Sequence, residues 1–137
     1  MNKQEKKAVK KWLKKKPRYL KVPVLHDRYS IAFCYGDAEK IKKILWNFHY
    51  PKNTEVDALI NGNRGLTFYA GLCHPVIAMP VKPDPKNIDH LETIVHECVH
   101  AVERLFQQIN HPIGDEIYAQ SVGATFRQIL EGLKKLS

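Results

Sequence analysis

The stretch Ile94-Val95-His96-Glu97-Cys98-Val99-His100-Ala101-Val102 decides how the rest of the chain is interpreted. It holds two histidines four residues apart, and a glutamate directly follows the first. On a helix, residues four apart lie one above the other, so His96 and His100 can present imidazole nitrogens to one metal ion while Glu97 lies beside it. Two histidines and an adjacent base form the core of a zinc hydrolase centre. Composition alone would produce an HExxH pattern in this chain at a rate of roughly 0.02, so chance explains it poorly.

The helix that carries this motif is predicted to have two different faces. Steps of about 100° per residue place a set of apolar side chains within about 40° of one line, whereas His96 and His100 lie roughly 140 to 180° away from it. We therefore expect the two histidines to face away from the core. The alternative is that they are ordinary solvated or core residues. The apolar set comprises Leu91, Val95, Cys98, Val102, Leu105 and Ile109.

The composition indicates one globular domain with a basic N-terminus. With 137 residues, 44% hydrophobic and 26% charged, the chain belongs to neither the disordered nor the fibrous class. Its net charge of +8 is unevenly distributed, because residues 1–21 contain ten Lys or Arg and one acid, and the remainder is nearly neutral. We expect a basic amphipathic helix within residues 1–21 and a catalytic domain of residues 22–137.

The basic segment predicts a helix over residues 3–16 that Pro17 ends. Its face is covered with lysine except for a narrow apolar stripe. The simplest interpretation is a solvated helix that docks Trp12 on the domain. The alternative is a helix that binds nucleic acid or an anionic surface. The stripe consists of Ala8, Val9, Trp12 and Leu13.

The cysteines and the hydropathy bear on the compartment. Cys34, Cys73 and Cys98 are odd in number and lack a CxxC spacing, so we interpret them as small core residues in a reducing environment. No apolar run follows the basic start, and no run of 18 apolar residues occurs. These features predict a soluble cytoplasmic protein without a transmembrane segment.

The remaining pattern predicts an α+β fold. We expect one buried strand, a helix, three short strands of which the first two form a hairpin, and two final helices. Asp37, then Asn87 or Asp89, and then Asp115 are the expected N-caps of the three helices. The expected strands are residues 29–34, 56–61, 66–70 and 76–79, and the expected helices are residues 38–49, 88–109 and a last one that begins after Asp115.

A catalytic zinc normally takes three protein ligands and one water, so the motif needs a third ligand from elsewhere. Glu103 would have to curl back along its own helix, and Glu131 lies about four turns into the last helix. Glu116 is the best placed, because it opens a helix expected to pack antiparallel to the first, with small residues beside it. The downstream candidates are Glu103, His111, Asp115, Glu116 and Glu131.

With Glu116-Ile117-Tyr118-Ala119 following HExxH, the sequence resembles the gluzincins, zinc metallopeptidases whose third ligand lies in an ExxA pattern on the next helix. The resemblance covers residues 56–130, and it is greatest to the short single-domain forms encoded by tailed bacteriophages. It implies a zincin-like fold with a small mixed sheet, an edge-strand hairpin, an HExxH helix and a C-terminal helix that carries the third ligand.

The resemblance also implies a function and a site. It identifies Zn2+ as the cofactor, a peptide or protein as the substrate, and His96, His100 and Glu116 as metal ligands. Glu97 becomes the general base of a zinc-dependent metallopeptidase acting as an endopeptidase. Residues 57–61 become the edge strand that pairs with an extended peptide, and the residues expected to bind substrate are Ala58, Leu59 and Ile60.

The sequence departs from the family pattern in two places. Gln120 stands where larger members have an aspartate that orients a ligand histidine. No residue matches the oxyanion-stabilising Tyr and His, for which Tyr118, His74 and His111 are the candidates. Two alternatives therefore remain open. One is a catalytically silent zincin-fold zinc protein used for interaction or assembly, and the other is a basic nucleic-acid-binding module with structural zinc.

Overall fold

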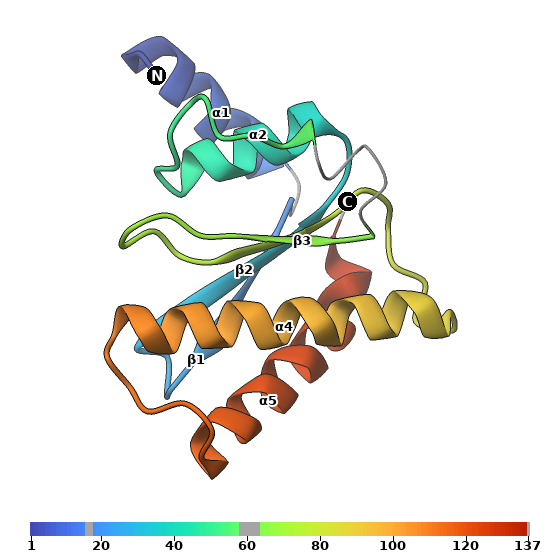
Figure 1. Cartoon of the computed structure of the whole chain (residues 1–137). Coiled ribbons are helices and arrows are strands. Elements are labelled where there is room, and N and C mark those ends of the chain that lie inside the picture. The colour runs from blue at the N-terminus through green and yellow to red at the C-terminus, as the bar shows by residue number, and fades with distance from the viewer. Residues whose placement is uncertain (16–17, 58–63, 137) are drawn as a thin grey trace.

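The computed structural model describes residues 1–15, 18–57 and 64–136, which form three layers (Figure 1). Helices α1 (Lys3–Lys15) and α2 (Ala38–Asn47) cover one side of a sheet. Helices α4 (Ile88–Gln108) and α5 (Glu116–Gly132) cover the other side, and a short 3-10 helix, η1 (Leu133–Lys135), follows α5. The expected α+β class is confirmed at this level.

In the described part of the chain, the sheet has four strands in the order β1-β2-β4-β3. β2 (Tyr29–Tyr35) and β4 (Val76–Met79) are parallel neighbours in its centre. β1 (Leu20–Val24) pairs antiparallel with β2, and β3 (Leu66–Phe68) pairs antiparallel with β4. The sheet is therefore mixed, and β3 lies at the edge on the α4 side of the fold.

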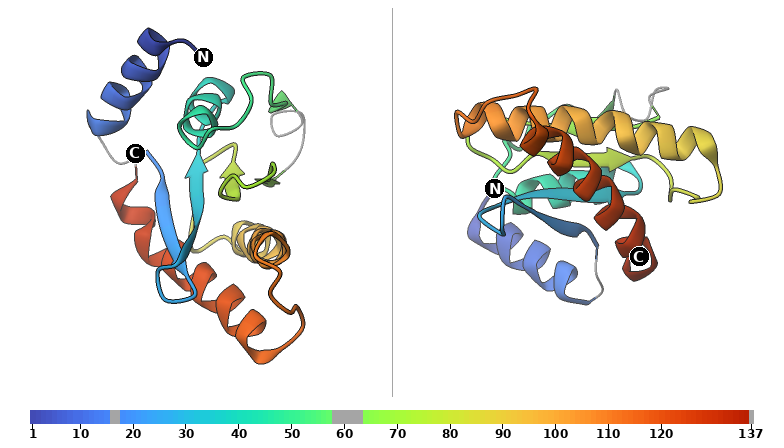
Figure 2. Two further views of the ribbon diagram at one scale, coloured as in Figure 1. Left: turned by 90° about the vertical axis from the view of Figure 1, so that its left-hand side faces the viewer. Right: turned by 90° about the horizontal axis from the view of Figure 1, so that it is seen from below.

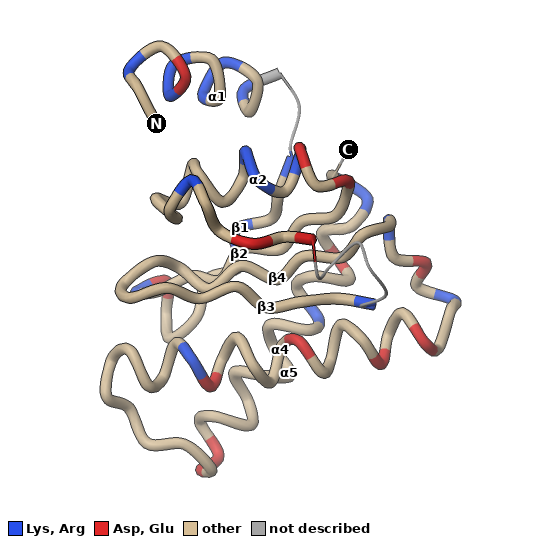
Figure 3. Tube along the Cα trace, turned by 45° about the horizontal axis from the view of Figure 1, so that its top comes forward, with Lys and Arg blue, Asp and Glu red and all other residues tan. Residues whose placement is uncertain are grey.

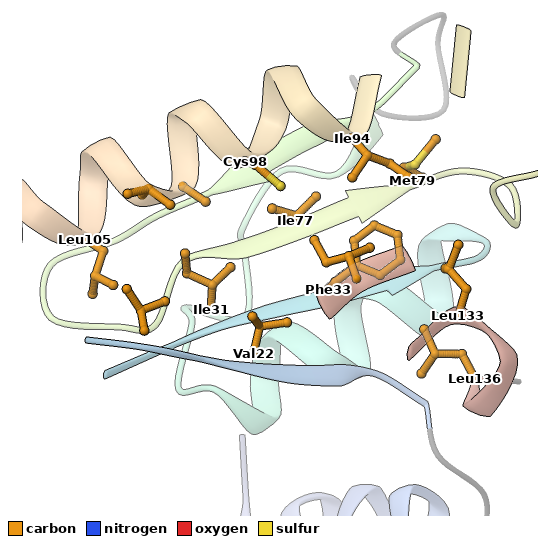
Figure 4. Close-up of a cluster of buried hydrophobic side chains, with 14 of the residues drawn as sticks. Val22, Ile31, Phe33, Ile77, Met79, Ile94, Cys98, Leu105, Leu133 and Leu136 are labelled. Atoms are coloured by element: carbon orange, nitrogen blue, oxygen red, sulfur yellow. The ribbon is translucent and has the colours of Figure 1, made fainter. Parts of the chain in front are cut away.

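The two sides of the sheet hold separate cores, because successive residues of a strand point to opposite faces. Ile31 and Phe33 of β2 belong to the cluster under α4 and α5, which Figure 4 shows. Ala32 and Cys34 belong to the cluster under α2. Both helical layers therefore cover β2, which explains why its pattern is continuously buried rather than alternating.

Three of the helices begin where side chains cap them. The Asp37 carboxylate accepts from the backbone N–H of Lys40, and the Asp115 carboxylate accepts from that of Tyr118. Asn87 rather than Asp89 caps α4, and its side chain accepts from two backbone N–H groups, including that of Asp89. These bonds satisfy donors that the first turn of a helix leaves free.

β1 is the element that the sequence did not predict, and the expected boundary after residue 21 falls within it. Its burial alternates, with Val22 and Val24 inside and Lys21 and Pro23 outside. Lys21 and Pro23 obscured the strand pattern in a segment of only five residues. Proline is tolerated there because β1 is an edge strand.

The predicted hairpin is only partly observable. The partner that the structure gives β3 is β4, through the register Leu66 to Ala78 and Phe68 to Val76. Val56 is buried outside any strand, and residues 58–61 of the predicted first strand lie outside the described residues. In the described part of the chain, no helix is long and apolar enough to cross a membrane.

Candidate metal centre

Helix α4 presents the two motif histidines to solvent. His96 and His100 are exposed, whereas Ile94, Cys98 and Leu105 point into the core on the other side of the helix (Figure 4). The predicted separation of the histidines from the core is therefore confirmed. The motif lies on an accessible face of a well-packed helix.

The predicted core stripe of α4 was partly wrong. Val95 is 39% exposed, and Leu91 and Ile109 are only half-buried. The physical reason is the oblique path of α5, which crosses α4 and covers only part of its length (Figure 2). The side of α4 that faces α5 is therefore less covered toward its ends. The buried residues of α4 are Thr93, Ile94, Glu97, Cys98, Ala101, Val102, Leu105 and Phe106.

The two imidazole rings converge. The Nε2 atoms of His96 and His100 lie 3.1 Å apart, and the ring centroids are 4.7 Å apart. Nitrogen ligands at about 2.0 to 2.1 Å from a tetrahedral zinc ion lie about 3.3 to 3.4 Å from each other. The observed spacing therefore fits two corners of one zinc ion. Without a metal, the same spacing is a hydrogen bond between one protonated and one unprotonated nitrogen.

Glu97 is the charged residue that the fold buries. Its exposure is 7%, and among the described residues no other Asp, Glu, Lys or Arg is as deeply buried. The Thr67 hydroxyl lies 3.0 Å from Glu97 Oε1 and 3.1 Å from the Glu97 carbonyl oxygen, so it donates to one of them at a time. Because an unpaired buried carboxylate is costly, Thr67 of β3 is the group that makes this position tolerable.

Gly65 lets the start of β3 lie directly over this carboxylate. A Cβ atom at Gly65 would come within 2.8 Å of Thr93 Cγ2 and 3.3 Å of Glu97 Cγ. No sequence pattern marked Gly65 or Thr67 as functional. Their role depends on the packing of β3 against α4. Thr67 and Glu97, which are in contact there, are 30 residues apart in the sequence.

His96 and Glu97 line the same pocket. A cavity of about 240 Å³ is lined by Arg64, Gly65, Glu92, Thr93, His96 and Glu97. Its walls are mostly polar, and Arg64 lies 3.7 Å from Asp89 in an exposed ion pair. A larger cavity of about 500 Å³ lies between the β1–β2 turn and α5, but it contains neither His96 nor Glu97. The smaller cavity is therefore the one that offers a reactive centre.

The third predicted ligand, Glu116, is not brought to the histidines. It is the exposed first residue of α5, and its Oε1 accepts a long bond of 3.5 Å from Gln120 Nε2. Over residues 1–15, 18–57 and 64–136, no three His, Cys, Asp or Glu side chains form a group that could hold a metal ion. A Cβ atom at Gly123 would meet nothing within 4 Å, so the small residues of α5 do not bring the two helices together there.

The three candidates for oxyanion stabilisation have structural contacts. His74 Nδ1 lies 2.9 Å from Ser30 Oγ, and His111 and Tyr118 both pack on the Phe106 ring. Burial raises the pKa of Tyr118, and the negative charge of Glu103 raises it further. None of the three lines the pocket that holds His96 and Glu97.

A different pair lies beside the histidine row. Arg104 follows His100 by four residues, so it continues the row of His96 and His100 along α4. Its guanidinium lies 3.9 Å from the centroid of the Tyr69 ring and donates to the Tyr69 hydroxyl at 2.9 Å. Arg104 and Tyr69 therefore place a cation and a phenol near the end of β3. The four-residue spacing between His100 and Arg104 is the sequence feature that could have predicted the position of Arg104 beside the histidines.

The predicted substrate-binding residues, Ala58, Leu59 and Ile60, lie outside the described residues. The described strand nearest the motif is β3, whose outer edge pairs with no strand of the described part of the chain. Thr67 of this strand contacts Glu97 directly. An extended segment paired with the outer edge of β3 would therefore pass close to Glu97.

Comparisons of the chain with protein-family models, with characterised proteins and with solved structures give no match.

Proposed function

We propose that the protein is a zinc-dependent metallopeptidase with a zincin-like fold that hydrolyses peptide bonds in a peptide or protein substrate. The observation that supports this most is the grouping of two convergent histidines with a buried glutamate that a strand residue holds in place. A solvent-facing structural pair of histidines would not require a carboxylate to be buried next to it. Burying a charged side chain costs stability, so a buried carboxylate is typical of a site where that group has a chemical role.

The residues present fit zinc at two of the three proposed positions. The Nε2 atoms of His96 and His100 are spaced as two ligands of one ion. Glu116 is the proposed third ligand, and the 3.5 Å bond from Gln120 is the one side-chain contact that holds its carboxylate within the described residues. Zinc, when bound, supplies a Lewis acid that makes water nucleophilic near neutral pH.

The chain's own groups account for the proton transfers. The Glu97 carboxylate accepts the proton of the attacking water and returns it to the amine nitrogen as the peptide C–N bond breaks. The Thr67 hydroxyl donates to Glu97 Oε1 and so orients this carboxylate, and Gly65 packs against the Glu97 side chain. The free edge of β3 supplies backbone groups that would pair with an extended substrate.

The decisive experiment is the substitution Glu97→Gln. The amide has nearly the same volume but no longer accepts the proton, so we expect zinc content to stay at one per chain and cleavage to fall at least 100-fold. Cleavage is measured with a proteome-derived peptide library, and zinc by elemental analysis. Glu39→Gln makes the same charge change in α2 and should cleave as the wild type does.

Two results would reject the proposal. The first is a wild-type protein with less than one zinc per chain, and the second is cleavage that survives Glu97→Gln. Zinc bound without any cleavage would instead support the catalytically silent zincin-fold protein. That alternative is favoured by the position of Glu116 outside a three-ligand group.

A further inference from the structure

Helix α1 uses its apolar face to dock on the domain. Val9 is buried, and Trp12 and Leu13 pack against the core cluster under α2. The Trp12 ring also has the Arg18 guanidinium 4.6 Å and the Lys43 ammonium 5.0 Å from its centroid. A helix that lies in a membrane interface inserts its apolar face among the lipids. Since that face of α1 is already covered, α1 is poorly suited to such insertion.

The opposite face of α1 forms a ridge of cations, and Figure 3 shows that Lys residues recur along the length of this helix. The ridge consists of Lys3, Lys7, Lys10 and Lys14, which recur at intervals of four, three and four residues and are all exposed. At 1.5 Å per residue, the ridge is about 17 Å long. Its linear form matches an extended polyanion better than a single small anion.

The ridge leads into a basic pocket. A cavity of about 420 Å³ is lined by four cations, with Tyr19, Asn47 and Leu13, and none of the described residues in its walls is acidic. None of its three lysines pairs with a carboxylate in the described part of the chain. Arg18 Nε is buried and has no hydrogen-bond partner among the described residues. The four cations are Lys10, Lys14, Arg18 and Lys21.

We infer that this pocket binds a phosphate group of a nucleic-acid backbone, and that the lysine ridge follows the neighbouring phosphates. Arginine and lysine together are the residues that contact phosphate oxygens in such complexes. The four cations around one cavity repel each other, and a phosphate would relieve that repulsion by accepting from their ammonium and guanidinium groups.

The contact is to the backbone rather than to the bases. Tyr19 is the one aromatic residue among the described residues that line the pocket, and its ring makes a T-shaped contact with Phe48 at a centroid distance of 5.0 Å. One half-buried ring does not provide the row of open aromatic platforms on which successive bases stack. We expect affinity for single strands of any sequence. The pocket lies on the α1–α2 side of the sheet, so this inference does not depend on the proposed peptidase (Figure 1).

The test measures binding of the full-length protein to a fluorescent oligothymidine by anisotropy. With four phosphate contacts, affinity should fall roughly 50-fold between 50 and 200 mM salt. The triple variant Lys10→Gln, Lys14→Gln, Lys21→Gln should bind at least tenfold more weakly at 50 mM salt. The slope of log affinity against log salt should become shallower by about 2.

A control variant removes the same charge elsewhere. Lys82→Gln, Lys86→Gln, Arg127→Gln changes three exposed cations outside α1 and outside the pocket, and it should bind within twofold of the wild type. Equal loss in the two variants would overturn the inference, because attraction would then come from net charge alone. Binding to phosphatidylserine vesicles without binding to oligothymidine would overturn it too, in favour of a membrane partner.

Discussion

The two sides of the sheet differ in whether their polar and charged side chains are buried or exposed. On the α4–α5 side, the fold buries polar groups. Of the five buried polar or charged side chains among the described residues, four lie there: Thr67, Thr93, Glu97 and Thr125. On the α1–α2 side, the buried residues are almost entirely apolar, and the lysines of the ridge on α1 are exposed.

This difference separates two kinds of function. A buried carboxylate such as Glu97 acts at one position, and its geometry depends on one neighbour, Thr67. A row of exposed lysines acts collectively, so no single member determines binding. Single substitutions should therefore have large effects on the first side and small effects on the second.

The first prediction is that the cores on both sides of the sheet exclude solvent equally well. The reactivity of their buried thiols measures this. Burial raises the pKa of Cys98, on the α4 side, and that of Cys34, on the α2 side, each to about 12. At pH 8 only about one in ten thousand of these thiols is the reactive thiolate. Cys73 is partly exposed. An aromatic disulfide reagent should therefore modify one thiol per chain rapidly and three only in denaturant.

The control for this prediction is Cys73→Ser, which should remove the rapid reaction. Reactivity of both buried thiols should increase as pH rises toward 12, since the thiolate fraction grows tenfold per pH unit. Rapid modification of Cys98 in the native protein would show that α4 separates readily from the sheet. Glu97, which lies next to Cys98, would then not be held in a buried position.

The next largest effect is expected at Thr67. Thr67→Val keeps the shape of the side chain but removes the hydroxyl that donates to Glu97. We expect the rate of peptide cleavage to fall about 10- to 100-fold, as is usual for a group that orients a catalytic residue. Zinc content should stay unchanged, because Thr67 contacts neither histidine in the interactions observed.

Thr67→Ser, which retains a hydroxyl, should restore most of the rate. Combining Thr67→Val with Glu97→Gln should lower the rate no further than Glu97→Gln alone, because both act through one carboxylate. Equal losses for the valine and serine variants would mean that packing, rather than the hydrogen bond, matters at this position.

The elements that the sequence predicted well are those with local signals. Helix α4 was expected over residues 88–109 and spans Ile88–Gln108, and the predicted caps Asp37 and Asp115 are both present. Apolar periodicity and capping residues act within one or two turns, so one segment reveals them. β1 was missed because its alternation of core-facing and exposed residues extends over only five residues and includes Pro23.

The candidate site divides in the same way. The convergence of His96 and His100 follows from their four-residue spacing on a helix, and it was predicted. The contacts of Glu97 with Thr67 and Gly65 join α4 to β3, and the position of Glu116 depends on the crossing of α5 over α4. Such relations between elements arise from packing, and no local pattern encodes them.

Two glycines offer a smaller test of how tightly the site is packed. Gly65→Ala places a methyl group against Thr93 and Glu97, so we expect the free energy of unfolding to fall by about 1 to 3 kcal/mol. Gly123→Ala adds a methyl group in open space within α5, so unfolding should cost up to about 1 kcal/mol more. Urea denaturation measures both, and each variant is the other's control. Similar values of the same sign would show that β3 does not lie tightly on α4.

The smallest effect is expected on the basic side, at Lys10. Its side chain is exposed and makes no ion pair among the described residues, so Lys10→Gln should change the free energy of unfolding by less than about 0.5 kcal/mol. Loss of one charge from a crowded ridge also reduces repulsion between lysines, which offsets any lost contact. Urea denaturation at low and high salt measures both contributions. A destabilisation above about 1 kcal/mol would mean that Lys10 supports the fold. The lysine ridge would then contribute to the packing of the fold. The contrast between Glu97, a buried charge that acts singly, and the exposed lysines that act together would not hold.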